Sequence, residues 1–319
     1  MRSVIGFLLI VGLLGGACWN VAAEEMDVGD VMAIAADPDD ADTLYIGTTK
    51  GLFSVSHLAK TPKLTCIGMP DIAINALAFD PAASGATLYV GTFAWGLYEF
   101  TSDGGDWTYR KVDDVATSGI NDLKFDIKDP GTLYVVANRH LYKSVGTPRT
   151  FERLRNTPKN VLFERLFLDP AAPEIMRLKG FTSEYFISSN GGESWEDDPT
   201  LKTYLHSWVV DKKVTSMCAN VNQERVICWR AMAVLLSDSI KHIDFFPEDH
   251  RTLLVSTFGN GLYKVRRIQN KWEVTGFEST ENKPIYSTLV RNFDPLDMYI
   301  GSANGILHTT DGVTWAPVW

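Results

Sequence analysis

One unit recurs along this chain, and it constrains the fold more than any other feature. Each copy has a short apolar strand, an Asp-Pro-type turn, a Leu-Tyr-Val-Gly-Thr-like strand, a glycine turn and a Gly-Leu-Tyr-like strand. The clearest copy runs from Asp80-Pro81 through Leu88-Tyr89-Val90-Gly91-Thr92 to Gly96-Leu97-Tyr98. The corresponding turns of the clear copies begin at Asp37, Asp80, Asp126, Asp169, Phe246 and Asp294, most of them about 43 to 48 residues apart. A period of roughly 40 to 50 residues built from short strands is typical of a β-propeller with one blade per repeat.

The interval between Asp169 and Phe246 is long enough for one more blade. Leu205 to Val210 resembles an inner strand, and the stretches on either side of Asn220 to Gln223 resemble a hairpin. We therefore predict an all-β fold, a seven-bladed propeller of four-stranded blades. The alternative is a six-bladed ring with an inserted hairpin.

The N-terminal segment predicts export. Arg2 is followed by an apolar run from Val4 to Ala17 and by small residues that end at Ala23, as in a secretory signal peptide. The apolar run is shorter than the roughly 18 residues of a spanning helix, so we expect no transmembrane span. The prediction is a signal peptide over residues 1–23 and one propeller domain over 24–319, in a secreted or periplasmic protein. A lipoprotein acylated at Cys18 is the alternative.

The charge balance excludes some partners. The chain has 39 acidic residues against 30 Lys and Arg, a formal net charge of −9. It has no run of basic residues of the kind that binds a phosphate backbone or an anionic membrane surface. We therefore expect neither nucleic acid nor a membrane as a partner.

The cysteines predict one possible bridge. Cys218 and Cys228 lie symmetrically about Gln223, so they should face each other across the hairpin and can form a disulfide in an oxidising compartment. The other interpretation is a pair of buried thiols. We expect Cys66 to be a free thiol. The sequence has no Cys-x-x-Cys motif or His/Cys cluster, so we predict no metal and no cofactor.

A second motif follows the third strand of several repeats. Ser188 to Trp195 fits the form Ser-x-Asp-x-Gly-x-Thr-Trp with Asn190 in the Asp place, and Thr309 to Trp315 matches it with one residue deleted. The short polar side chain can bond amides of its own turn, and glycine supplies a positive φ. We interpret these residues as structural.

This motif, together with the repeat, resembles the Asp-box (BNR-repeat) propeller superfamily. That superfamily includes sialidases, xyloglucanase-type hydrolases, sortilin-type receptors and photosystem II assembly factors. The resemblance implies the fold, with Asp-boxes on the face opposite the ligand site, but it implies no particular activity. The chain lacks the Phe-Arg-Ile-Pro signature of sialidases, and it has one propeller where xyloglucanases have two.

Connectivity predicts which loops share a face. The starts of the inner strands and the turns between second and third strands emerge together around the channel mouth, while the Asp-Pro turns and Asp-boxes emerge on the other side. Exposed aromatic residues in these turns could stack on a sugar ring or hold a peptide side chain. The candidate binding residues at the mouth are Asn75, Phe93, Trp95, Asn121, Arg139, Glu164, Arg165, His206, Lys241, His242, Phe258 and Tyr286.

We therefore predict a monomeric, non-enzymatic binding or scaffolding module for a protein or glycan of the cell envelope. The alternative is a glycoside hydrolase, whose chemistry needs two carboxyl groups about 5 to 9.5 Å apart. Glu164 and Asp122 are the acid pair expected at the mouth, and Tyr286 with Glu164 would be a sialidase-like nucleophile pair. No motif indicates a nucleophilic triad.

Because the chain ends four residues after Trp315, we also expect the outer strand of the last blade to come from Glu24 to Val31. Such an exchange of strands would close the ring.

Overall fold

A computed structural model describes most of the chain. The described residues are 27–56, 62–83, 85–115, 119–126, 128–146, 149–169, 172–181, 184–198, 218–222, 225–228, 240–246, 249–257, 259, 261–268, 271–277, 280, 283–293, 296–303 and 305–319.

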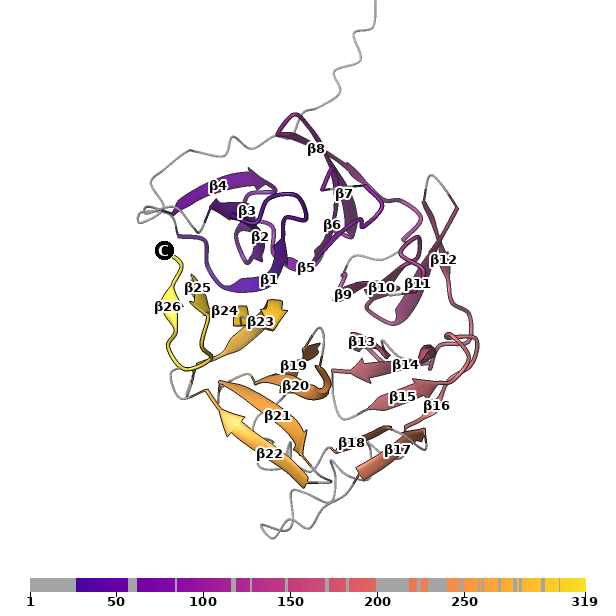
Figure 1. Cartoon of the computed structure of the whole chain (residues 1–319). Coiled ribbons are helices and arrows are strands. Elements are labelled where there is room, and N and C mark those ends of the chain that lie inside the picture. Colours follow the sequence, from indigo (N-terminus) through magenta and orange to yellow (C-terminus); the bar gives the residue numbers. More distant parts are fainter. Residues whose placement is uncertain are drawn as a thin grey trace, which may run out of the picture.

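These residues form six four-stranded antiparallel sheets arranged as the blades of a propeller around a central axis (Figure 1). Within every blade the strands are hydrogen-bonded in chain order, and Figure 1 shows the first strand of each blade nearest the axis. Blade 1 contains β1 (Val31–Ala36), β2 (Thr43–Thr48), β3 (Gly51–Ser56) and β4 (Lys63–Gly68). Blade 2 contains β5 (Ile74–Phe79), β6 (Thr87–Thr92), β7 (Leu97–Asp103) and β8 (Asp106–Lys111). Blade 3 contains β9 (Asp122–Phe125), β10 (Leu133–Ala137), β11 (His140–Val145) and β12 (Thr150–Arg153).

The second half of the chain continues the same order. Blade 4 contains β13 (Phe163–Asp169), β14 (Ala172–Gly180), β15 (Tyr185–Ser188) and β16 (Glu196–Asp197). Blade 5 contains β19 (Ile240–Phe246), β20 (Asp249–Thr257), β21 (Leu262–Ile268) and β22 (Lys271–Gly276). Blade 6 contains β23 (Ile285–Phe293), β24 (Leu296–Ser302), β25 (Gly305–Thr309) and β26 (Ala316–Pro317).

The number of blades corrects the sequence-based prediction. Between blades 4 and 5 the described residues add only a two-stranded hairpin, β17 (Cys218–Asn222) with β18 (Arg225–Cys228), which lies outside the ring (Figure 1). Lys241 Nζ on β19 lies 3.4 Å from Glu164 Oε1 on β13, so the inner strands of blades 4 and 5 are direct neighbours. The seven-blade prediction is therefore wrong, and six blades with an inserted hairpin is confirmed. The expected extra inner strand, Leu205 to Val210, lies outside the described residues.

The closure of the ring also differs from the expectation. The outer strand of blade 6 is β26, from the C-terminal end of the chain, and Val31 begins the inner strand of blade 1. Ser287 Oγ donates a hydrogen bond to the carbonyl oxygen of Val31 at 3.2 Å, and one apolar cluster joins Val28 and Val31 to residues of blade 6 such as Tyr299. Side-chain packing therefore closes the ring between complete blades, without an exchanged strand.

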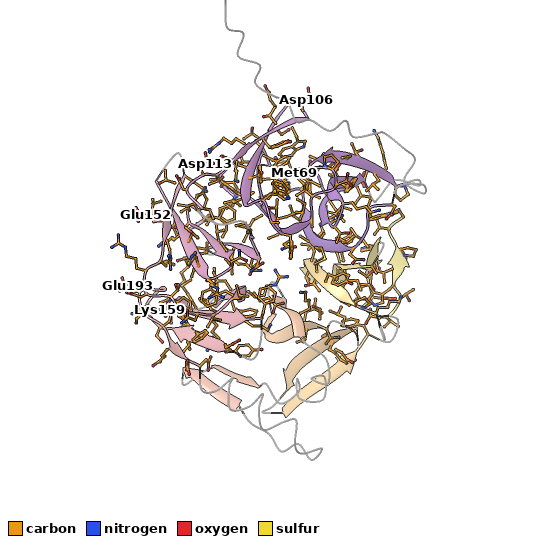
Figure 2. All side chains as sticks on the ribbon, turned by 180° about the vertical axis from the view of Figure 1, so that it is seen from behind. Met69, Asp106, Asp113, Glu152, Lys159 and Glu193 are labelled. Atoms are coloured by element: carbon orange, nitrogen blue, oxygen red, sulfur yellow. The ribbon has the colours of Figure 1, made fainter. Side chains whose placement is uncertain are left out.

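The core consists of layers between neighbouring blades. Leu77 and Phe79 of β5 pack toward blade 1, where the Phe79 ring meets Tyr45 edge-on at 5.2 Å, while Ala76 and Ala78 pack toward blade 3. The alternation along an inner strand thus places successive side chains in the layers on its two sides. Charged side chains lie at the outer rim, and Figure 2 shows Asp113, Glu152, Lys159 and Glu193 there.

The repeated glycine of the second strand is explained by how closely blades approach. A Cβ placed on Gly91 would lie 2.5 Å from Ile120 Cγ2 of the next blade, and one on Gly47 would lie 2.5 Å from Ile74 Cγ2. Real Cβ atoms do not come this close, so a side chain at either position would force the blades apart.

Local hydrogen bonds account for the turn motifs. Asp37 Oδ1 accepts the N–H groups of Asp39 and Asp40 at 2.9 and 3.2 Å, as expected for an Asp-Pro turn. In the turn after β15, Asn190 Oδ1 accepts the N–H of Ser194 at 3.0 Å, and the indole N–H of Trp195 donates to its own turn. The polar groups of these side chains bond their own turns, which agrees with the structural interpretation of the motif.

Cys218 and Cys228 are direct partners in the register of β17 and β18, which confirms that they face each other along the backbone. Their side chains lie outside the described residues, so the disulfide stays a prediction. Cys66 is disulfide-bonded, so the expectation of a free thiol is wrong. The side chain of its partner also lies outside the described part.

Candidate functional site

The mouth face of the propeller is the predicted binding face. It is formed by the starts of the inner strands and by the turns that join second to third strands. At the β6–β7 turn, Phe93 N–H donates to the carbonyl of Ala73, which immediately precedes β5, at 2.9 Å. The structure therefore brings the two kinds of segment together on one face.

A β-bulge shapes the ring of residues around the channel. The register with the second strand shifts near the start of five inner strands, at Met32, Asn75, Glu164, Lys241 and Tyr286. A bulge inserts an extra residue and re-aims the side chains beside it. The repeat in the sequence contains no signal for the bulge itself.

Asn75 and Asn121 link neighbouring blades. The side-chain amide of Asn75 donates to the carbonyl of Ile120 at 3.2 Å, and that of Asn121 donates to the carbonyl of Phe163 at 2.7 Å. Each bond joins the inner strand of one blade to the entrance of the next. These two predicted binding residues therefore have a structural function at the mouth.

The acid pair considered for glycoside hydrolysis is engaged in ion pairs. Glu164 is buried and forms ion pairs with Lys179 and Lys241. Asp122 is buried, lies 3.5 Å from the Arg165 guanidinium, and accepts the backbone N–H groups of Leu123 and Leu166, both at 3.0 Å. In this arrangement both carboxylates stabilise the mouth of the channel.

Burial shifts the pKa values of two groups around Glu164. Desolvation lowers the pKa of the Lys241 ammonium and outweighs the opposing effect of the Glu164 carboxylate, while Arg165 and Lys179 lower it further. Burial, with the charge of Glu164, raises the pKa of the neighbouring Tyr185 hydroxyl. The cluster of Glu164, Arg165, Lys179 and Lys241 therefore contains more cations than anions and is partly shielded from water.

Tyr286, the other nucleophile candidate, interacts with Asp30. Desolvation and then the charge of Asp30 raise the pKa of its hydroxyl, and Asp30 also hydrogen-bonds it. A raised pKa keeps the phenol neutral, which is the weaker nucleophilic form.

Two exposed aromatic side chains stand out in the β6–β7 turn. Thr92 Oγ1 accepts the N–H of Trp95 at 2.8 Å and donates to the carbonyl of Gly96 at 2.8 Å, which fixes the turn. Phe93 and Trp95 remain 68 % and 59 % exposed. An ordered turn thus presents two large apolar side chains to solvent.

Two residues outside the predicted set extend this surface. Phe181, which follows β14, is 51 % exposed and occupies the same kind of turn as Phe93; Leu162, just before β13, is 44 % exposed. The N–H of Phe181 donates to the carbonyl of Leu162 at 3.0 Å, so the two lie together. The sequence signal for Phe181 is its place directly after Gly180, the glycine that ends the second strand of blade 4.

Contacts across blade 3 connect the pair Phe93 and Trp95 to the pair Leu162 and Phe181. A Cβ placed on Gly119 would lie 2.8 Å from both the carbonyl oxygen of Phe93 and Oδ1 of Asn138, and the carbonyl of Asn138 accepts the N–H of Phe163 at 2.7 Å. Arg139, next to Asn138, is exposed. We call Phe93, Trp95, Arg139, Leu162 and Phe181 the blade 2–4 surface.

His140 lies beside this surface. Burial, followed by the charges of Arg153 and Arg139, lowers the pKa of its imidazole. The ring is therefore neutral at neutral pH, and the positive charge near this turn comes from the two arginines.

Three predicted binding residues lie wholly or in part outside the described part of the chain. His206 and Phe258 lie outside the described residues, as does the side chain of His242. Within the described part of the chain, no group of three or more His, Cys, Asp or Glu side chains is placed to hold a metal ion. The same residues include no helix with the length and apolar character of a membrane span.

No protein-family model matches the sequence, and no curated protein matches it either. Solved structures match its fold. The extracellular domain of the hybrid two component system BT3049 from B. thetaiotaomicron has a TM-score of 0.62 at 14 % identity, over 94 % of this chain and 42 % of that one. YCF48 bound to D1 peptide has a TM-score of 0.57 at 13 % identity, over 90 % and 94 %. The GH74 xyloglucanase from Xanthomonas campestris has a TM-score of 0.54 at 14 % identity, over 91 % and 46 %.

These similarities define the class of the protein. The chain is a β-propeller, and its similar structures include both enzymes and binding modules. It spans about half the length of the GH74 enzymes that it matches. At such identities the similarity establishes the fold and leaves the function open.

Proposed function

We propose that this propeller is an exported, non-enzymatic module that binds a protein partner through the blade 2–4 surface. The observation that carries the proposal is the exposure of Phe93 and Trp95 in blade 2 and of Leu162 and Phe181 at blade 4, on the same face. Exposed apolar side chains gathered on a rigid surface mark interaction sites, and Trp and Arg are enriched among the residues that dominate binding energy.

A protein partner fits this surface better than a glycan does. Aromatic rings such as Trp95 can stack on sugars, but the aliphatic side chain of Leu162 offers no ring for stacking. A protein interface uses aromatic, aliphatic and arginine side chains together. YCF48, a propeller of similar length, was solved bound to D1 peptide, which is consistent with this use of the fold.

The ion pairs at the mouth favour binding over hydrolysis. An inverting or retaining hydrolase needs one carboxylic acid to donate a proton and a second carboxylate to act on the sugar or on water. Glu164 has two lysine partners, and Asp122 has two backbone donors. Both carboxylates are therefore engaged in contacts within the mouth itself.

Two sequence features complete the proposal. The N-terminal 23 residues predict a signal peptide, so the partner is expected in the cell envelope or outside the cell. The turns around Asn190 and Asp311 bond their own backbones as an Asp-box does, which supports a place among Asp-box propellers.

Site-specific photocrosslinking in intact cells tests the proposed surface. A photoreactive phenylalanine analogue would replace Trp95 or Phe181, and Val313 would be the matched control because it is 73 % exposed on the opposite face. We expect a discrete protein adduct from positions 95 and 181 and none from 313. We also expect Trp95→Ala with Phe181→Ala to weaken binding of the identified partner at least about tenfold.

The proposal is overturned if positions 95 and 181 give no adduct beyond that of position 313. It is also overturned if a glycan array shows binding that depends on Trp95 while no protein is crosslinked. Turnover of a glycoside that Glu164→Gln abolishes would instead establish the hydrolase.

A further inference from the structure

The outer strand of blade 2, β8, is an open sheet edge. It is the last strand in the order of its sheet, and every residue of Asp106–Lys111 except Trp107 is exposed. Of the other outer strands with described side chains, β12, β16 and β26 are two to four residues long, and β4 has one exposed residue of six. Proteins usually shorten or cover such edges, because their unpaired N–H and C=O groups can pair with another strand. The long, exposed edge of β8 is therefore a candidate for strand pairing.

The bonds between β7 and β8 show which backbone groups the edge offers. The N–H of Val112 donates to the carbonyl of Leu97 at 2.9 Å, and bonded pairs alternate with non-bonded pairs along antiparallel strands. Every second residue of β8 therefore bonds β7, while Trp107, Tyr109 and Lys111 direct their backbone groups away from the sheet. No described residue pairs with these outward groups.

The sequence of β8 is complementary to a second copy of itself. Residues 106–110 have an acid and a base at their ends, an aromatic residue next to each, and threonine at the centre. In an antiparallel pair centred on Thr108, Asp106 of one copy lies opposite Arg110 of the other. Trp107 likewise lies opposite Tyr109, and both pairs occur twice by symmetry. Opposite charges, aromatic pairs and Thr–Thr pairs all stabilise strands when they lie directly opposite each other.

The neighbouring registers fit less well. Centring the pair on Tyr109 sets Asp106 opposite Val112 and loses the ion pair. Centring it on Arg110 sets two guanidinium groups opposite each other, and like charges in that position destabilise a sheet. The charges therefore select the register centred on Thr108.

The aromatic side chains of the edge are held in place before any pairing. The Tyr109 ring stacks on Phe100 with centroids 4.7 Å apart, and the Trp107 ring meets Tyr45 edge-on at 5.5 Å. Tyr109 nevertheless remains 43 % exposed. Ordered side chains lose little conformational freedom on association, which favours pairing.

We propose that two copies of this protein form a dimer by pairing their β8 strands antiparallel about Thr108. The two four-stranded sheets of blade 2 then become one continuous sheet with a twofold axis at its centre. One pair of strands is a small interface, so we expect a weak dimer with a Kd between about 1 and 100 µM. A dimer departs from the monomer expected from the sequence. Its interface contains no residue of the blade 2–4 surface and does not depend on the protein partner.

Charge reversal with sedimentation velocity tests the dimer. Asp106→Arg and Arg110→Asp each set like charges opposite each other twice, so each should weaken the dimer at least about tenfold. An equimolar mixture of the two variants restores the opposite charges between unlike chains and should recover most of the dimer. Glu152→Arg, a reversal at an exposed position of β12, is the matched control and should dimerise as the wild type does.

A cysteine at the centre of the pair tests the register. Residues opposite each other in a non-hydrogen-bonded pair have Cα atoms about 4.5 Å apart, which a disulfide can span. We expect mild oxidation to link two copies of the Thr108→Cys variant. Thr101→Cys is the matched control, because Thr101 is exposed beside Thr108 and their hydroxyl groups bond each other at 3.1 Å, so both variants lose the same contact. Position 101 lies one strand further in and should not crosslink.

A protein that sediments as a monomer above about 100 µM would overturn the proposal. A dimer that neither reversal weakens, or a mixture that recovers nothing, would place the contact elsewhere and overturn it too. So would crosslinking of Thr108→Cys that does not exceed that of Thr101→Cys, a result that decides the proposal even if a charge variant fails to fold. Photocrosslinking at Trp95 has no bearing on these measurements, so the two proposals can fail separately.

Discussion

At the scale of single residues, short polar side chains fix the turns of this propeller. Asp311 Oδ1 accepts the N–H groups of Val313 and Thr314 at 2.8 and 2.7 Å. These donors, Thr314 first, lower the pKa of the Asp311 carboxyl from 3.8 to about 2. Asn190 fills the same place in blade 4 without a charge, so the turn requires an acceptor and benefits from an anion.

This difference predicts how Asp311→Asn depends on pH. A carboxyl whose pKa is lower in the folded state stabilises the protein above its unfolded pKa of about 4, and this stabilisation is lost as the pH falls through about 2. We expect the variant to melt on the order of 1 °C below the wild type at pH 7, because an exposed carboxylate contributes little. Thermal melting from pH 7 to pH 2 should show this gap closing.

Asp311→Ala is the matched comparison, because it removes the acceptor as well as the charge. Its deficit should be larger than that of the Asn variant and should persist at pH 2. A gap for Asp311→Asn that stays constant over the whole pH range would contradict the explanation.

The turn residues were predictable because their bonds are local. The donors of Asp37, Asn190 and Asp311 all lie within four residues, so the motif contains both partners. Leu162 and Phe181 were not selected, because their exposure depends on how blades 3 and 4 meet. The partners of Glu164 were equally hidden, since Lys241 is distant in sequence and reaches it only in the closed ring.

At the scale of strands, a glycine sets the distance between blades. Gly91 in β6 faces Ile120, which is fully buried at the entrance to blade 3. The same contact recurs between Gly47 and Ile74, so the glycine of the Leu-Tyr-Val-Gly-Thr strand is a packing feature of the repeat.

Gly91→Ala should therefore destabilise the protein. Its new Cβ would lie 2.5 Å from Ile120 Cγ2, and forcing an extra methyl group into a packed layer costs about 1 to 3 kcal/mol. Denaturant unfolding should show this as a lower free energy of unfolding with an unchanged m-value.

Gly104→Ala is the control, since no atom lies within 4 Å of a Cβ at that position. Its φ of +62° carries a backbone cost of about 1 kcal/mol but no packing cost. If Gly91→Ala unfolded at the same denaturant concentration as the wild type, close blade approach would not be the reason for the glycine.

At the scale of the whole molecule, periodicity established the architecture but not the blade count. Each repeat specifies its own strands through alternation and turn chemistry, so all six blades follow the predicted order. A stretch such as Leu205 to Val210 alternates like an inner strand, and composition alone cannot show whether it enters the ring. Ring size depends on which blades touch, as Glu164 and Lys241 do.

Closure was predicted incorrectly for a related reason. A short C-terminal tail suggested that the N-terminal segment would supply the last strand, but two residues, Ala316 and Pro317, are enough to form β26. Val318, which follows them, is 8 % exposed and packs with Val28, Val31 and Tyr299. The tail therefore completes the apolar layer between the last blade and the first.

Deleting residues 316–319 should accordingly destabilise the ring. The deletion removes β26 and the Val318 side chain, whose burial alone contributes about 1.5 to 3 kcal/mol, so the free energy of unfolding should fall by at least about 2 kcal/mol. Val313→Ala is the control, because that side chain is 73 % exposed and its truncation should change stability by less than about 0.5 kcal/mol. Closure by an exchanged N-terminal strand would leave the tail dispensable. Equal denaturation midpoints for the truncated and complete chains would therefore favour strand exchange over the packed closure.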